Sequence, residues 1–281
     1  MSAKALVTLT IGDKTIAEFN AFRPTWEKYA AQHGYDLLVI DDYLDDAPIA
    51  RERAANWQKL LVCRDKRVAG YKDAVWLDSD ILINFHNAPC IVAANQAAAD
   101  KVGLVSHRQA YYSAPETRDN AVRRMGLGEI ADFYAAAKLD PVDDYSNTGV
   151  MVFKPALHAA IFEHVYASYE ENPGSAKEES PLSHYLYGNG LASAIDPRFN
   201  RLWVFEVAQK YPILLNVGAR AKELLMVSCA TSAWLNSYFT HFTGDRLDGA
   251  GGEYIMRHDV RFVAQGLSDV KSFRNFDLSR L

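Results

Sequence analysis

One stretch of ten residues decides the fold of this chain: Ala74-Val75-Trp76-Leu77-Asp78-Ser79-Asp80-Ile81-Leu82-Ile83. Apolar residues flank a short acidic break, which predicts a buried strand that is polar at one point. Residues two apart in a strand point to the same side, so we expect Asp78 and Asp80 to be neighbours. Neighbouring carboxylates repel each other and are costly near a core. A divalent cation, Mn²⁺ or Mg²⁺, resolves both problems because these ions prefer oxygen ligands.

A turn between two short strands, with solvated aspartates, is the alternative interpretation of this stretch. An isolated Asp-x-Asp usually means no more than that. We favour the metal site because few turns have three apolar residues directly before and after them, as this one does at 75–77 and 81–83.

The segments around the acidic stretch predict an α/β fold. A strand is expected over 5–10, a helix over 15–33 that ends at Gly34, a strand over 35–40 and a helix over 56–67. Strand–helix–strand order predicts a Rossmann-like, mostly parallel central sheet flanked by helices. The sequence has no internal repeat and no low-complexity linker, so residues 1–281 are interpreted as a single domain.

Composition excludes several classes of protein. The chain has 281 residues, of which 49% are hydrophobic and 23% charged, as in an ordinary globular enzyme. Its net charge of −5 gives no support to nucleic-acid binding. Three scattered cysteines without a CxxC pair argue against a disulfide framework or a structural zinc site. The sequence shows neither a signal peptide nor a long apolar run, so we expect no transmembrane segment and a cytoplasmic protein.

The segment from Trp76 to Ile83 resembles the Asp-x-Asp strand of retaining glycosyltransferases with the GT-A fold, notably the glycogenin, bacterial lipopolysaccharide galactosyltransferase and xylosyl/galactosyltransferase group. In that group the first aspartate reaches the donor ribose and the metal, and the second binds the metal. The resemblance implies these roles for Asp78 and Asp80, with Ser79 also in the donor site. It further implies a nucleotide-binding half over 1–110, an acceptor and donor-sugar half over 111–245, and a tail over 246–281.

Two segments before the acidic stretch agree with this resemblance. Thr8 and Thr10 end the first strand, where relatives hold the nucleotide base and ribose. The β-propensity of threonine explains them equally well. Lys59, in Trp57-Gln58-Lys59, resembles a Trp-x-Lys of the group and would reach the donor phosphates. A surface lysine on an amphipathic helix is the alternative.

Two later segments fit the sugar side of such a site. Tyr145 to Phe153 resembles an Asn-x-Gly segment that leads into a strand, in which Asn147 binds sugar hydroxyls and Gly149 allows close approach of a ligand. An ordinary turn is the alternative. Glu178 and Glu179 lie where relatives line the reacting face of the sugar, which makes them candidate catalytic residues with Asn147. An exposed acidic helix start is the alternative.

The segment from Thr240 to Gly244 resembles the late His-x-x-Gly of the group. The resemblance implies that His241 is a third metal ligand and that Gly244 lies against the diphosphate; a neutral imidazole suits Mn²⁺. Relatives often continue into Lys-Pro-Trp, whereas this chain has Asp245-Arg246-Leu247. The lysine contact of the family is therefore missing, and Arg246 or Lys59 would replace it.

Together these residues predict a metal-dependent transfer of sugar, with retention, from a nucleotide-sugar donor such as a UDP-sugar to a carbohydrate or glycolipid acceptor. A homo-oligomer is compatible with the sequence. One alternative is a carbohydrate- or nucleotide-binding protein that kept the fold and lost turnover. Another is a sugar-1-phosphate nucleotidylyltransferase, but that class carries a glycine-rich loop after the first strand, where this chain has one glycine, Gly12.

Overall fold

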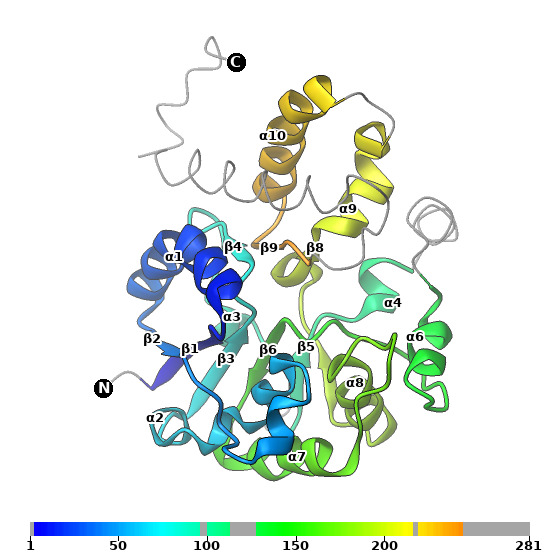
Figure 1. The fold of residues 1–281 in the computed structure, drawn as a ribbon. Coiled ribbons are helices and arrows are strands. Elements are labelled where there is room, and N and C mark those ends of the chain that lie inside the picture. Colours follow the sequence, from blue (N-terminus) through cyan, green and yellow to red (C-terminus); the bar gives the residue numbers. More distant parts are fainter. Residues whose placement is uncertain (1–2, 96–99, 113–127, 216–218, 244–281) are drawn as a thin grey trace.

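A central six-stranded sheet organises the chain, which a computed structural model describes over residues 3–95, 100–112, 128–215 and 219–243 (Figure 1). Its order is β2-β1-β3-β6-β5-β7. The strands are β1 (Lys4–Leu9), β2 (Asp36–Ile40), β3 (Asp73–Leu77), β5 (Val102–Leu104), β6 (Val150–Phe153) and β7 (Ala192–Ala194). Neighbours are parallel except at β6, which runs antiparallel to both β3 and β5. The predicted mostly parallel α/β sheet is confirmed.

Alternation along β3 divides the core into two layers. Val75 and Leu77 pack with α1 (Asp13–His33), whereas Ala74 and Trp76 pack with the opposite layer. That layer contains the 3-10 helix η2 (Ala55–Arg64), α7 (Pro155–Ser168) and α8 (Glu179–Gly188). Figure 1 shows α1 and α7 on opposite sides of the sheet. Because successive strand residues point to opposite faces, a strand such as β3, which is apolar from Ala74 to Leu77, is stable only when both faces are covered.

The prediction of one continuous strand over 74–83 is wrong. β3 ends at Leu77, residues 78–80 form a turn, and β4 (Ile81–Ile83) begins a second sheet. This sheet has the order β4-β9-β8, with β9 (Phe239–His241) and β8 (Arg201–Leu202). The chain changes partners within the turn, where Asp78 N donates to Gly149 O at 2.8 Å and Phe242 N donates to Asp80 O at 3.1 Å. The turn, not strand alternation, therefore sets how the two aspartates lie.

The remaining elements complete the described chain. They are η1 (Pro48–Arg51), α2 (Lys66–Ala69), α3 (Ile91–Ala94), α4 (His107–Ala110), α6 (Ile130–Ala136), η3 (Pro197–Asn200), α9 (Trp203–Lys210), η4 (Pro212–Leu215) and α10 (Ala219–Leu235). The helix predicted over 56–67 is therefore a 3-10 helix followed by one turn of α-helix. Gly34 ends α1 as predicted, with a left-handed φ of 68°. No helix in the described part of the chain has the length and apolarity needed to cross a membrane.

Candidate metal and nucleotide-sugar site

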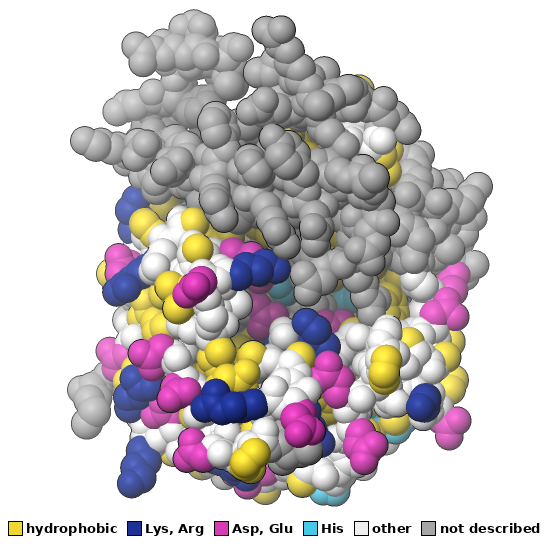
Figure 2. Space-filling view, viewed as in Figure 1, with side chains coloured by type: hydrophobic (Ala, Val, Ile, Leu, Met, Phe, Trp, Pro, Cys, Tyr) yellow, Lys and Arg dark blue, Asp and Glu magenta, His cyan; other side chains and the backbone are white. Residues whose placement is uncertain are grey.

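A cleft of about 380 Å³ opens beside the acidic turn and has the size of a small-molecule site. In Figure 2, acidic and histidine side chains lie together in the hollow near the centre of the view. Its lining includes Leu9 and Ile11 near the end of β1, Trp76 and Asp78 near the end of β3, and Asn147, Glu179 and several aromatic residues from later segments. Polar groups thus converge where β1 and β3 end, which is where open α/β sheets bind ligands.

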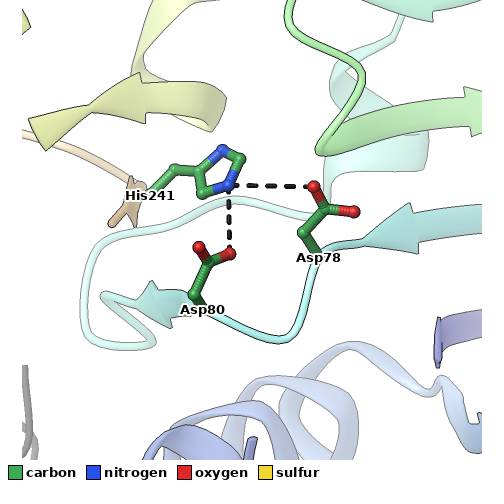
Figure 3. A group of neighbouring side chains, drawn as sticks. All are labelled: Asp78, Asp80 and His241. Carbon is green, nitrogen blue, oxygen red and sulfur yellow. Dashed lines mark ion pairs between the residues drawn. The ribbon is translucent and has the colours of Figure 1, made fainter. Parts of the chain in front are cut away.

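Three side chains from two distant segments meet in this cleft: Asp78 and Asp80 from the turn, and His241 from the end of β9 (Figure 3). One ligand atom from each lies within 4.8 Å of the other two. His241 Nε2 is 3.0 Å from Asp80 Oδ1 and 3.9 Å from Asp78 Oδ2. Two carboxylates and one imidazole are a donor set that fits Mn²⁺, so the residues present match the predicted ion.

The electrostatics of the cluster favour a positive charge at its centre. Burial lowers the pKa of His241, but Asp80 and Asp78 outweigh burial and raise it above its ordinary value. Burial raises the pKa of Asp78, but Lys59 and His241 outweigh it, so this carboxyl titrates below its usual range. A metal ion among these groups would replace the proton of His241, which couples metal binding to proton release.

Lys59 is buried between two carboxylates rather than exposed on a helix. Its side chain is 2% exposed, and Nζ lies 2.9 Å from Asp78 Oδ1 and 2.8 Å from Glu178 Oε1. Trp76 Nε1 donates to the same Asp78 oxygen at 2.7 Å. These two donors occupy Oδ1, whereas Oδ2 faces His241. The alternative of a surface lysine is wrong, while the predicted contact of Lys59 with donor phosphates stays a prediction.

The two predicted acidic residues at the start of α8 lie in different surroundings. Glu178 is 3% exposed, pairs with Lys59 and accepts a hydrogen bond from Thr148 Oγ1 at 3.3 Å. Glu179 is half-buried and accepts from Tyr145 Oη and Asn147 Nδ2, both at 2.6 Å. Both line the cleft, so an exposed acidic helix start describes neither. Glu179 is the more accessible carboxylate of the pair.

Gly149 provides the space for the ring of His241. A Cβ built on Gly149 would clash with Cε1 of His241 and lie 2.7 Å from its Nδ1. The ring of His241 therefore fills the space that the missing side chain leaves, and the Gly149 amide donates to Asn147 Oδ1 at 3.0 Å. The close approach predicted for this glycine is made by a protein side chain.

Replacement of Gly149 by alanine is expected to weaken Mn²⁺ binding at least about 10-fold, because the new Cβ displaces a ligand ring held by its surroundings. Isothermal titration with Mn²⁺ measures this. Gly188→Ala is the matched control, since a Cβ there meets its nearest atom at an ordinary 3.7 Å. Equal Mn²⁺ affinity in the two variants would contradict the role of Gly149.

The other predicted site residues differ in position. Ser79 lines the cleft beside the two aspartates. At the end of β1, Leu9 and Ile11 line the cleft, whereas Thr8 and Thr10 are buried. Their contact with a nucleotide stays a prediction. Gly244 and the tail over 246–281 lie outside the described residues, so the diphosphate contact predicted there is not tested.

Sequence reasoning missed the roles of two polar residues. His107 begins α4, lines the cleft, and accepts a hydrogen bond at Nε2 from the Asn147 amide at 3.2 Å. Asn200 ends η3 and contacts both Asn147 and His241. An isolated polar residue has no periodicity from which its partner could be predicted.

His107 is expected to make the fold less stable in acid. Burial lowers its pKa to about 3, so below its unfolded pKa of about 6.5 the unfolded chain takes up a proton that the folded chain excludes. The free energy of unfolding then falls by about 1.4 kcal/mol per pH unit, or about 2 kcal/mol between pH 7 and 5. The measurement is urea unfolding of wild type and His107→Gln at several pH values; glutamine keeps an acceptor for Asn147. The free energy of unfolding should fall less steeply with decreasing pH in the variant than in wild type. The same pH dependence of the free energy of unfolding in both proteins would contradict this.

Comparison with known proteins bears on the fold. No protein-family model matches this chain, and no curated protein matches it significantly. Solved structures do resemble it. A glycosyltransferase involved in the glycosylation of the major capsid of PBCV-1 gives a TM-score of 0.53 at 16% identity, covering 90% of this chain and 99% of that one. The bifunctional glycosyltransferase WbbM, in its apo structure, gives 0.49 at 12% identity, covering 87% and 46%. The first similarity confirms the predicted α/β fold, which this chain shares with that glycosyltransferase.

Proposed function

We propose that this chain is a metal-dependent glycosyltransferase that uses a nucleotide-sugar donor. The observation that carries the proposal is the meeting of Asp78, Asp80 and His241 within 4.8 Å, in a cleft at the ends of β1 and β3. The fold shared with a glycosyltransferase supports it. A carboxylate pair that merely faced water would need neither the histidine nor the glycine that leaves space for its ring.

The residues of the cluster suit the leaving-group side of such a reaction. A nucleoside diphosphate gains negative charge as the glycosidic bond breaks, and an Mn²⁺ or Mg²⁺ ion held by the three ligands would stabilise that charge as a Lewis acid. The imidazole ligand favours Mn²⁺, because Mg²⁺ prefers oxygen. Lys59 and Trp76 would keep Asp78 oriented through Oδ1. From the sequence resemblance we propose a UDP-sugar as the donor.

The part of the cleft that is lined by later segments suits the sugar. Asn147 and Glu179 present polar atoms there, and Phe133 and Phe205 present aromatic surface, a combination that fits a ring with one apolar face and several hydroxyls. Glu179 would lie at the reacting face, because Glu178 is engaged by Lys59. We propose a carbohydrate or glycolipid acceptor and retention of configuration. NMR of the anomeric proton of the product tests retention, and an inverted product would refute it.

The experiment that tests the proposed function is a thermal-shift panel of nucleotide sugars with Mn²⁺ and with EDTA, followed by donor hydrolysis. We expect one nucleotide sugar to raise the melting temperature, and to be hydrolysed, when Mn²⁺ is present but not in EDTA. A metal-dependent shift without hydrolysis or transfer would indicate a binding protein. Release of pyrophosphate from a nucleoside triphosphate and a sugar 1-phosphate would indicate a nucleotidylyltransferase. Hydrolysis that EDTA leaves unchanged would refute metal dependence.

A further inference from the structure

Asn200 lies behind the metal-ligand histidine, on the side away from the two aspartates. We propose that Asn200 is a positioning residue that fixes the tautomer of His241, so that Nε2 is the nitrogen available to a metal ion. The inference rests on the proposed metal site and extends it to a residue outside the ligand set. Its basis is the set of hydrogen bonds made by the buried side-chain amide of Asn200. These bonds allow only one assignment of donors and acceptors between Asn147, Asn200 and His241.

The orientation of the Asn200 amide is determined by Asn147. Asn200 is 1% exposed, and its Nδ2 lies 3.2 Å from Asn147 O and 3.0 Å from Asn147 Oδ1. Asn147 Oδ1 is itself identified as an oxygen, because it accepts from the Gly149 amide. Both Asn147 atoms are acceptors only, so the group facing them must be the NH₂ of Asn200. The flipped amide would place an oxygen against two oxygens in a buried environment.

This orientation leaves the Asn200 oxygen for His241. Oδ1 of Asn200 lies 2.9 Å from Nδ1 of His241. Since that oxygen only accepts, Nδ1 must carry a hydrogen. A metal-ligating imidazole is neutral and has one N–H, so with Nδ1 protonated it is Nε2, on the side of Asp80 and Asp78, that would give up its proton and offer a lone pair to an ion. The nitrogen of a metal-ligating histidine that is not on the metal commonly donates to such a partner, which fixes the ring and its tautomer.

The backbone of Asn200 is held as well as its side chain. Tyr111 Oη donates to Asn200 O at 2.8 Å, and the same hydroxyl accepts from Leu202 N at 2.9 Å. Asn147, the partner of the Asn200 amide, donates in turn to Glu179. One continuous set of hydrogen bonds thus joins the metal-ligand histidine to the residues that we place at the sugar.

The test is the Mn²⁺ affinity of Asn200→Ala, measured by titration with Mn²⁺ alone. Removal of such a partner typically costs 10–100-fold in metal affinity, and we expect a loss in that range. Asn84→Ala is the matched control: Asn84 is also 1% exposed, but its Nδ2 donates to the carbonyls of Trp234 and Ser237 at 2.9 and 3.3 Å. We expect the control to bind Mn²⁺ within about twofold of wild type, because it leaves the partner of the ligand ring in place.

The outcomes separate this inference from the function on which it rests. Equal Mn²⁺ affinity in Asn200→Ala and wild type overturns the inference alone, as does an equal loss in both alanine variants. A wild type that binds no Mn²⁺ overturns the metal site and the inference together. A second measurement needs no variant: ¹⁵N NMR of the Mg²⁺-loaded wild type should show His241 protonated at Nδ1 and not at Nε2. The reverse tautomer overturns the inference.

Discussion

Replacement of Asp80 by asparagine is expected to lower metal-dependent turnover of the nucleotide-sugar donor by about 1,000-fold. Asp80 is the carboxylate nearest His241 Nε2, at 3.0 Å, and its exchange for a neutral amide of the same shape removes half of the negative charge that the two aspartates offer an ion. Loss of one preorganised group that stabilises transition-state charge costs on the order of 100- to 1,000-fold, and here an ion would be weakened as well. The measurement is kcat/KM for donor hydrolysis over a series of Mn²⁺ concentrations.

Asp65→Asn is the control for this substitution. Asp65 caps α2 through the Arg67 amide and lies outside the cleft, and asparagine caps helices about as well as aspartate. We expect unchanged turnover in the control. Because the carboxylates raise the pKa of His241, Asp80→Asn should also lower that pKa. Full activity of Asp80→Asn at low Mn²⁺ would show that the acidic turn does not hold the ion.

The buried strand before the acidic pair could be predicted from the sequence, because a strand that is buried on both faces needs apolar residues on both. Val75 and Leu77 on one side and Trp76 on the other illustrate this. The end of the strand could not be predicted from that stretch. It depends on Gly149 and Phe242, which bind the turn from segments far along the chain. Non-local hydrogen bonds of this kind have no counterpart in local periodicity.

The residues of the candidate site also differ in how far the sequence predicts their positions. Asp78, Asp80 and His241 were placed in one ligand set by resemblance, and their convergence follows from the pairing of β4 with β9. Lys59 was less predictable, because a lysine on an apolar helix segment is compatible with either a surface or a buried position. What determines its position is the presence of two carboxylates, Asp78 and Glu178, on elements that follow it in the sequence.

Lys59→Met is expected to lower the free energy of unfolding by about 3–5 kcal/mol, the usual cost of leaving a buried charge without its partner. Methionine fills a similar volume, so packing changes little. Glu178, 3% exposed, would keep a carboxylate whose nearest cation is gone. Urea unfolding measures the loss. Lys66→Met, at the exposed first residue of α2, is the control and should change stability by less than about 0.5 kcal/mol.

A double variant identifies the cause of this loss. If the uncompensated Glu178 carboxylate destabilises Lys59→Met, then Glu178→Gln in the same chain should recover part of the stability, because a neutral amide costs less to bury than a charge. The Asp78 carboxylate depends less on the Lys59 ammonium than Glu178 does, since it is 22% exposed and keeps the hydrogen bond from Trp76. A double variant as unstable as the sum of the two single variants would contradict this cause, because it would show no coupling between Lys59 and the charge of Glu178. Recovery would show that one buried ammonium holds the turn of Asp78 to Asp80 to the start of α8, and so joins the residues that we propose for the leaving group to those that we propose for the sugar.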